Sequence, residues 1–81
     1  MLETPHSSPN VYDLLSPGEL RVLELAAQGM TNARAAAHLG VTVHAIKFHL
    51  VSIYRKLGVS NRTAAAAMFL RSSLPDAATK D

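Results

Sequence analysis

The chain has 81 residues, a formal net charge of +2, 13 alanines, four aromatic residues and no cysteine. This length allows one domain that buries only about 60% of its unfolded surface, and the lack of cysteine excludes disulfides and thiolate metal sites. No apolar stretch reaches the roughly 20 residues that cross a membrane, and the first residues lack the order of a secretory signal, so we expect a cytoplasmic protein.

The first predicted helix begins at a capping box. Ser16 is followed by Pro17 at the first helical position and by Glu19 three residues after the cap. Gly29 marks the end of this helix, since glycine readily takes the left-handed conformation there. Residues 1–13 are rich in proline and small polar residues, and we expect them to form a flexible lead-in.

Three further helices are predicted downstream, each opened by a polar capping residue and closed by glycine or proline. Their expected spans are about 32–39, 43–57 and 61–73. No segment shows sustained alternation of apolar and polar residues, so we expect an all-α fold without strands. The folded domain is expected at 14–74, followed by a disordered tail at 75–81.

The second and third predicted helices carry the residue types of a helix-turn-helix. Ala36, Gly40 and Ile46 are separated by four and six residues. A small residue lets two helices cross closely, a glycine takes the backbone angle of the turn, and a branched apolar residue locks the pair. We therefore expect these two helices to pack together in this way.

The third predicted helix has two different faces at 100° per residue. We expect an apolar stripe to be buried, consisting of Ile46, Leu50, Ile53 and Leu57. The opposite stripe consists of His44, Phe48, Val51 and Arg55, with Lys47 and Ser52 at its flanks. In a major groove such side chains would face base edges and phosphates, with Lys47 nearest the start of the helix.

Basic residues dominate the second half of the chain. Residues 31–74 contain six Lys or Arg residues and no carboxylate, whereas residues 1–30 have a net charge of −3. A positive surface is the footprint expected for a polyanionic partner. The alternative is a chance imbalance of charge on a solvated face.

Five segments resemble, in order and spacing, the LuxR/GerE-type helix-turn-helix: residues 15–23, 29–32, 46–49, 56–59 and 61–63. The resemblance covers about residues 14–71. It implies a four-helix LuxR/GerE-like DNA-binding domain of a bacterial transcription regulator, acting at the nucleoid. It also implies that the helix at about 43–57 reads the major groove and that the helix at about 61–73 mediates dimerisation.

The resemblance also implies roles for single residues. Base contacts carried over by position fall on Lys47, Phe48 and Val51, and phosphate contacts fall on Asn32, Thr42 and Arg62. The outward stripe adds His44 and Arg55 to the expected DNA-binding set. A symmetric dimer contact is expected at Thr63, Ala64, Ala67, Met68 and Arg71.

Several positions depart from the family pattern. Gly18 stands where a basic residue is common, and Ala45 stands where a threonine hydroxyl would be available to phosphate. Phe48 and Val51 make the outward face more apolar than is typical of a helix that reads DNA. An alternative function is therefore a protein-interaction module of the same fold, which docks to another regulator through Phe48 and Val51.

Glu19 has two candidate roles, and both are structural. One is to complete the cap of the first helix. The other is an ion pair with Lys56 or Arg55, which would brace the first helix against the third.

We expect neither catalysis nor a metal or cofactor. The chain shows no Ser–His–Asp set and no glycine-rich phosphate loop, and His44 and His49 lie about 140° apart on one helix. The expected partners are double-stranded DNA and a second copy of the chain, with RNA polymerase or another regulator as further candidates. No membrane and no small-molecule ligand is expected. Both a complete single-domain regulator and an excised output domain fit these residues.

Overall fold

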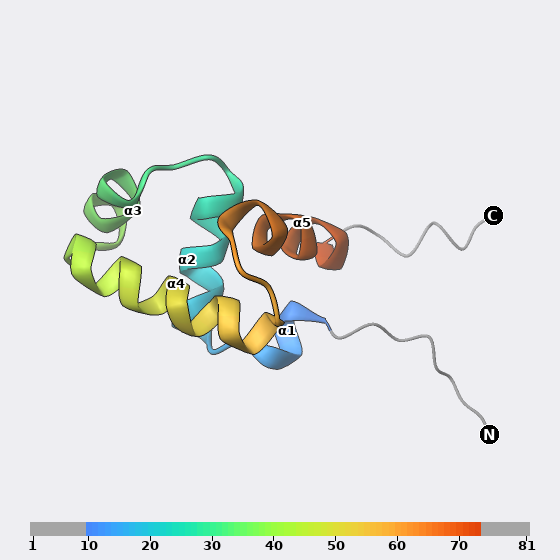
Figure 1. Cartoon of the computed structure of the whole chain (residues 1–81). Coiled ribbons are helices and arrows are strands. Elements are labelled where there is room, and N and C mark those ends of the chain that lie inside the picture. Colours follow the sequence, from blue (N-terminus) through green and yellow to red (C-terminus); the bar gives the residue numbers. More distant parts are fainter. Residues whose placement is uncertain (1–9, 74–81) are drawn as a thin grey trace, which may run out of the picture.

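The structure, a computed structural model, describes residues 10–73 as five α-helices joined by short turns (Figure 1). The helices are α1 (Val11–Leu14), α2 (Pro17–Ala27), α3 (Asn32–Leu39), α4 (Val43–Leu57) and α5 (Arg62–Ser73). The described residues contain no strand, so the all-α prediction is confirmed. Within them no single helix is long and apolar enough to cross a membrane, although α3 and α4 pass that test together as a bent pair. The predicted tail and residues 1–9 of the predicted lead-in lie outside the described residues.

Each of the four long helices begins with a capping hydrogen bond. At α2, the Ser16 hydroxyl accepts from the Glu19 backbone N–H at 3.2 Å, and the Glu19 carboxylate accepts from the Ser16 N–H at 2.9 Å. Thr31, Thr42 and Asn61 accept from the backbone N–H three residues later, at 3.1, 3.0 and 2.8 Å. Each bond satisfies a donor that the first turn of a helix leaves unpaired. The predicted spans of these helices therefore agree closely with the structure.

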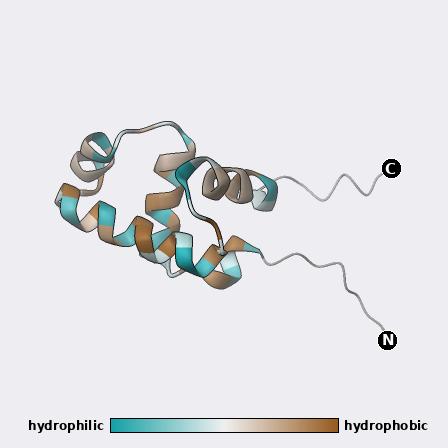
Figure 2. Ribbon diagram, viewed as in Figure 1, coloured by the Kyte–Doolittle hydropathy of each residue, from teal (hydrophilic) through white to brown (hydrophobic). Residues whose placement is uncertain are grey.

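Helix α2 lies at the centre of the fold, in contact with α3, α4 and α5 (Figure 1). Hydrophobic and hydrophilic residues alternate along α4, as in a helix with one buried face (Figure 2). Burial of a large aliphatic side chain stabilises a fold by about 1.5–3 kcal/mol, so the leucines and isoleucines contribute most here. The buried core consists of Val11, Leu15, Val22, Leu23, Leu25, Ala35, Ala36, Ile46, Leu50, Ile53, Leu57 and Ala65.

The single-turn helix α1 lies at the end of the predicted lead-in and was not among the predicted helices. Val11 is fully buried, and its N–H donates to the Ser72 hydroxyl at 3.3 Å. The Tyr12 hydroxyl lies 3.1 Å from the Ser73 hydroxyl, and the Tyr12 ring lies 6.2 Å from the ring of Phe69. One turn is too short to show helical periodicity. Asn10 caps it locally by accepting from the Tyr12 N–H, and its other contacts come from α4 and from α5, up to 61 residues later in the chain.

Candidate nucleic-acid interface

Helices α3 and α4 form a helix-turn-helix. They are bent by 107° relative to one another and joined by the three residues 40–42. Two helices of this motif meet at about 90–120° across a turn of this length. Gly40 has a φ of +70°, in the left-handed region that strains other residues, while Ala36 and Ile46 are buried. The helix-turn-helix prediction is therefore confirmed at all three positions.

Helix α4 presents one face to the core and another to solvent. The predicted stripe of Ile46, Leu50, Ile53 and Leu57 is buried, as expected. The opposite side carries five exposed side chains, called here the outer face of α4: His44, Lys47, Phe48, Val51 and Arg55. The structure thus brings five of the eight predicted DNA-binding residues onto one solvent-facing surface.

The outer face of α4 is positively charged. Lys47 and Arg55 are eight residues apart, which places them about 12 Å apart along the helix axis. Arg34 on α3 is also exposed, and residues 31–73 of the described chain contain no carboxylate. Helices α3, α4 and α5 therefore add no negative charge that would oppose a polyanion at this surface.

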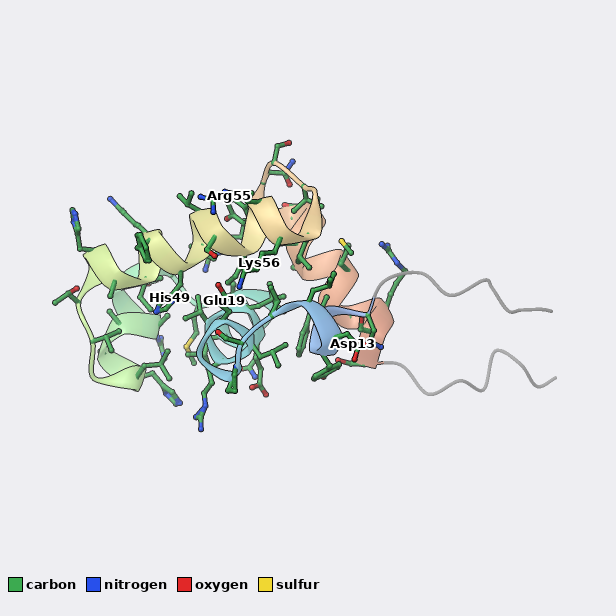
Figure 3. All side chains as sticks on the ribbon, turned by 90° about the horizontal axis from the view of Figure 1, so that it is seen from below. Asp13, Glu19, His49, Arg55 and Lys56 are labelled. Atoms are coloured by element: carbon green, nitrogen blue, oxygen red, sulfur yellow. The ribbon has the colours of Figure 1, made fainter. Side chains whose placement is uncertain are left out.

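A hydrogen-bonded cluster around Glu19 holds α4 against α2. The carboxylate of Glu19, whose residue is only 6% exposed, accepts from the Ser52 hydroxyl at 2.7 Å and from the Lys56 ammonium at 2.9 Å. Burial raises the pKa of Glu19, but hydrogen bonds from the Ser16 N–H, Lys56 and Ser52 outweigh it and lower the pKa to about 2. Lys56 points toward Glu19, while Arg55 lies on the outer side of α4 (Figure 3). Both predicted roles of Glu19 are present, with Lys56 as its partner.

Ser52, predicted at the flank of the outward stripe, is half-buried. Its hydroxyl is engaged by Glu19 rather than free for a ligand. The sequence does contain a clue to this contact. Ser52 and Lys56 are four residues apart, and residues four apart on a helix lie on the same side. A prediction that pairs Glu19 with Lys56 therefore implies that Ser52 is near Glu19 as well.

Two predicted phosphate-contacting residues lie together at the junction of α3 and α5. The Arg62 guanidinium donates to the Asn32 side-chain oxygen at 2.8 Å and also to the backbone carbonyl of Met30. Both side chains are half-buried. Arg62 therefore connects the start of α5 to the start of α3 in this structure.

Thr42, the third predicted phosphate contact, caps α4 and remains exposed. Its hydroxyl oxygen accepts from the Ala45 N–H at 3.0 Å. A threonine hydroxyl that accepts one hydrogen bond still has its own proton to donate. Thr42 can therefore cap the helix and donate to an anion at the same time.

The predicted dimer residues are divided between surface and core. Thr63 and Arg71 are exposed, whereas Ala64 and Ala67 are half-buried. Met68 packs partly against the core. Of the predicted dimer residues, Thr63 and Arg71 are therefore open to a second copy, while Ala64, Ala67 and Met68 are partly covered by the chain itself.

His49 does not share the outer face. It is half-buried, and its ring meets that of Phe48 edge-on with 6.2 Å between the centroids. Within residues 10–73, no group of three or more His, Asp or Glu side chains is placed to hold a metal ion.

Residues 13–69 match the family described as "GerE: Bacterial regulatory proteins, luxR family". The chain belongs to the LuxR family. The match covers α2 to α4 and most of α5, and it includes all the predicted DNA-binding residues. Of the predicted dimer residues, Arg71 alone lies beyond it.

Several proteins named as transcriptional regulators are also similar to this chain. It is 43% identical over 54 residues to the probable transcriptional regulatory protein SgaR of Hyphomicrobium methylovorum, covering 67% of this chain and 26% of that protein. It is 45% identical over 56 residues to the quorum sensing-dependent regulator RpaR of Rhodopseudomonas palustris, covering 69% and 23%. With the transcriptional regulatory protein LiaR of Bacillus subtilis it shares 38% identity over 71 residues, covering 85% and 34%. The chain thus matches between 23% and 34% of the length of these relatives.

Proposed function

We propose that this chain binds double-stranded DNA in a sequence-specific manner as a bacterial transcription regulator, with α4 in the major groove. The observation that carries the proposal is the outer face of α4, which is exposed, basic and mounted on a helix-turn-helix. Membership of a family of bacterial regulatory proteins supports the same function. Such a protein works in the bacterial cytoplasm, at the nucleoid, and needs no catalytic residue or cofactor.

The outer face of α4 has dimensions and chemistry that suit the major groove. The groove is about 12 Å wide and admits one α-helix. Lys47, near the start of α4, donates to guanine or to a phosphate, while Arg55, two turns further on, meets the phosphate backbone. Thr42, and His44 in the first turn of α4, lie at the positive end of the helix dipole, where phosphate is favoured.

Dimerisation through α5 completes the proposal. Two copies related by a two-fold axis would place two α4 helices in successive major grooves, about one helical turn of DNA apart. The small side chains of Ala64 and Ala67, although half-buried, would let a second copy approach α5 closely beside the exposed Thr63 and Arg71. RNA polymerase or another regulator is the further partner that a transcription regulator requires.

A protein-interaction module is the second candidate function. The observation that favours it is the exposure of Phe48 and Val51, which are 73% and 57% exposed on the outer face of α4. Apolar side chains in such a position also suit a protein partner. In that case α4 would bind another regulator instead of DNA.

Selection of bound sequences from a random duplex pool separates the two functions. The purified chain is incubated with the pool at low and at physiological salt, and the enriched sequences are read. DNA binding predicts enrichment of a two-fold symmetric motif and an affinity that falls steeply with salt. Absence of duplex binding at low salt, together with capture of a protein partner that Phe48→Ala abolishes, would support the second function and overturn the first.

A further inference from the structure

The outer face of α4 carries two large apolar side chains at its centre. Phe48 is 73% exposed and Val51 is 57% exposed, and the buried residues of α4 all lie on its other side. The Phe48 ring is supported at its edge by His49, at a centroid distance of 6.2 Å. Phe48 therefore projects from α4 into solvent, with the His49 ring at one of its sides.

Basic residues surround Phe48 and Val51, and their charge favours a negatively charged partner. Lys47 and Arg55 lie on the same outer face, and residues 31–73 contribute no carboxylate to it. A protein that covered Phe48 and Val51 would have to bring matching negative charge, whereas DNA supplies it from the phosphates on both sides of the groove. Charge complementarity therefore favours duplex DNA as the occupant.

The major groove offers one apolar group at the base edges, the C5-methyl of thymine. Neither phenylalanine nor valine can donate or accept a hydrogen bond through its side chain. Every base also presents polar atoms at this edge, which lose hydrogen bonds to water beside an apolar side chain, and only thymine adds a methyl group whose burial offsets that cost. Thymine is therefore the base that these two side chains can bind favourably.

The spacing of Phe48 and Val51 matches neighbouring base pairs. Three residues of α-helix advance about 4.5 Å along the axis, and successive base pairs are about 3.4 Å apart. The two side chains differ by about 60° around the helix, so both can reach the groove floor at once. One side chain then meets the methyl group of one base pair while the other meets that of an adjacent pair.

We propose that Phe48 and Val51 read thymine methyl groups on adjacent base pairs of each half-site, so that the recognised sequence contains thymine at these steps. This inference rests on the proposed DNA-binding function. Lys47, next to Phe48, then supplies the polar contact at the neighbouring position. Specificity at the centre of the half-site comes from apolar contact rather than from hydrogen bonds.

Replacement of thymine by deoxyuridine tests the inference, since it removes the methyl group and keeps the base pair. The selected duplex is synthesised with deoxyuridine at one half-site thymine at a time, and affinity is measured for the unchanged chain, Phe48→Ala and Val51→Ala. We expect an affinity loss of about fourfold at one or two positions, from the apolar contribution of one methyl group. At the position that Phe48 reads, Phe48→Ala should abolish the effect of deoxyuridine, and Val51→Ala should do so at the other.

Two controls accompany this measurement. Deoxyuridine outside the half-sites should leave the affinity unchanged, and Leu14→Ala, which shortens an exposed apolar side chain on α1, should retain the full deoxyuridine effect. If every thymine can be replaced without loss, or if the loss persists in both alanine variants, methyl reading by these residues is wrong while DNA binding stands. If the chain binds no duplex at all, the proposed function itself fails.

Discussion

Glu19 on α2 and Lys56 on α4 are joined by an ion pair of 2.9 Å, and the same carboxylate caps α2 and binds Ser52. The buried side chain of Glu19 therefore holds α4, the helix proposed to enter the major groove, in place against α2. Protonation or replacement by glutamine removes the negative charge, which ends the ion pair with Lys56 and weakens the other hydrogen bonds, so this cluster has a defined pH dependence.

We expect Glu19→Gln to lower the free energy of unfolding at pH 6 and to have little effect near pH 2. The pKa of Glu19 falls from 4.5 to about 2 in the folded chain. Its stabilising contribution is therefore complete above pH 4.5 and is lost as the pH falls through 2. The shift corresponds to about 3 kcal/mol, and urea unfolding of both chains at several pH values measures it.

Glu24→Gln is the matched control, since Glu24 is an exposed carboxylate on the same helix. It should change the stability by less than about 0.5 kcal/mol at pH 6. A difference between the original chain and Glu19→Gln that stays constant from pH 6 to pH 2 would contradict the assigned role of the ionised carboxylate.

Local features of this fold were predictable, and the contacts between distant residues were less so. The cap at Ser16, the turn at Gly40 and the buried Ile46 follow from residue types within a few positions of one another. The pair of Arg62 with Asn32 and the packing of α1 on α5 join residues 30 and 61 apart. No local pattern encodes such contacts, because they depend on how the helices pack. The outer face of α4 was predictable because helical periodicity alone determines which residues share it.

We expect Gly40→Ala to destabilise the chain by about 1 kcal/mol. No atom lies within 4 Å of an added Cβ, so the cost comes from the left-handed backbone at φ +70° rather than from a clash. Gly18→Ala is the matched control, because Gly18 lies inside α2 with equal space around it. That change should stabilise by about 0.5–1 kcal/mol, since alanine favours the helix. Thermal unfolding of the two variants should thus show shifts of opposite sign, and shifts of the same sign would contradict this account.

We expect Arg62→Ala to cost about 1–2 kcal/mol of stability, because it removes hydrogen bonds to Asn32 and to the Met30 carbonyl. Arg71→Ala, which removes an exposed arginine from the same helix, should cost less than about 0.5 kcal/mol. Unfolding in urea measures both values. If Asn32→Ala and Arg62→Ala have strictly additive effects, the side chains are not coupled as their 2.8 Å contact implies.

A phosphate contact by Arg62 would add a second effect, which is separable from stability. The logarithm of the binding constant for duplex DNA falls with the logarithm of salt concentration, with a slope of about −0.9 for each phosphate neutralised. Arg62→Ala should then bind DNA more weakly and with a shallower slope. A weaker affinity with an unchanged slope would mean that Arg62 acts only by positioning α3 and α5.

We expect Lys47→Ala to weaken duplex binding about tenfold, as for the loss of one good polar contact in the major groove. Lys47 is exposed on the outer face of α4, so the fold should tolerate the change, and circular dichroism and urea unfolding should match those of the original chain. Arg21→Ala is the matched control, because it removes an exposed basic residue from α2, outside the acid-free span.

Titration of a selected duplex at several salt concentrations distinguishes two modes of contact by Lys47. A slope that falls by about 0.9 per bound subunit indicates phosphate, whereas an unchanged slope with relaxed preference at one base pair indicates a base edge. Equal effects of Lys47→Ala and Arg21→Ala would mean that binding depends on total charge rather than on the outer face of α4.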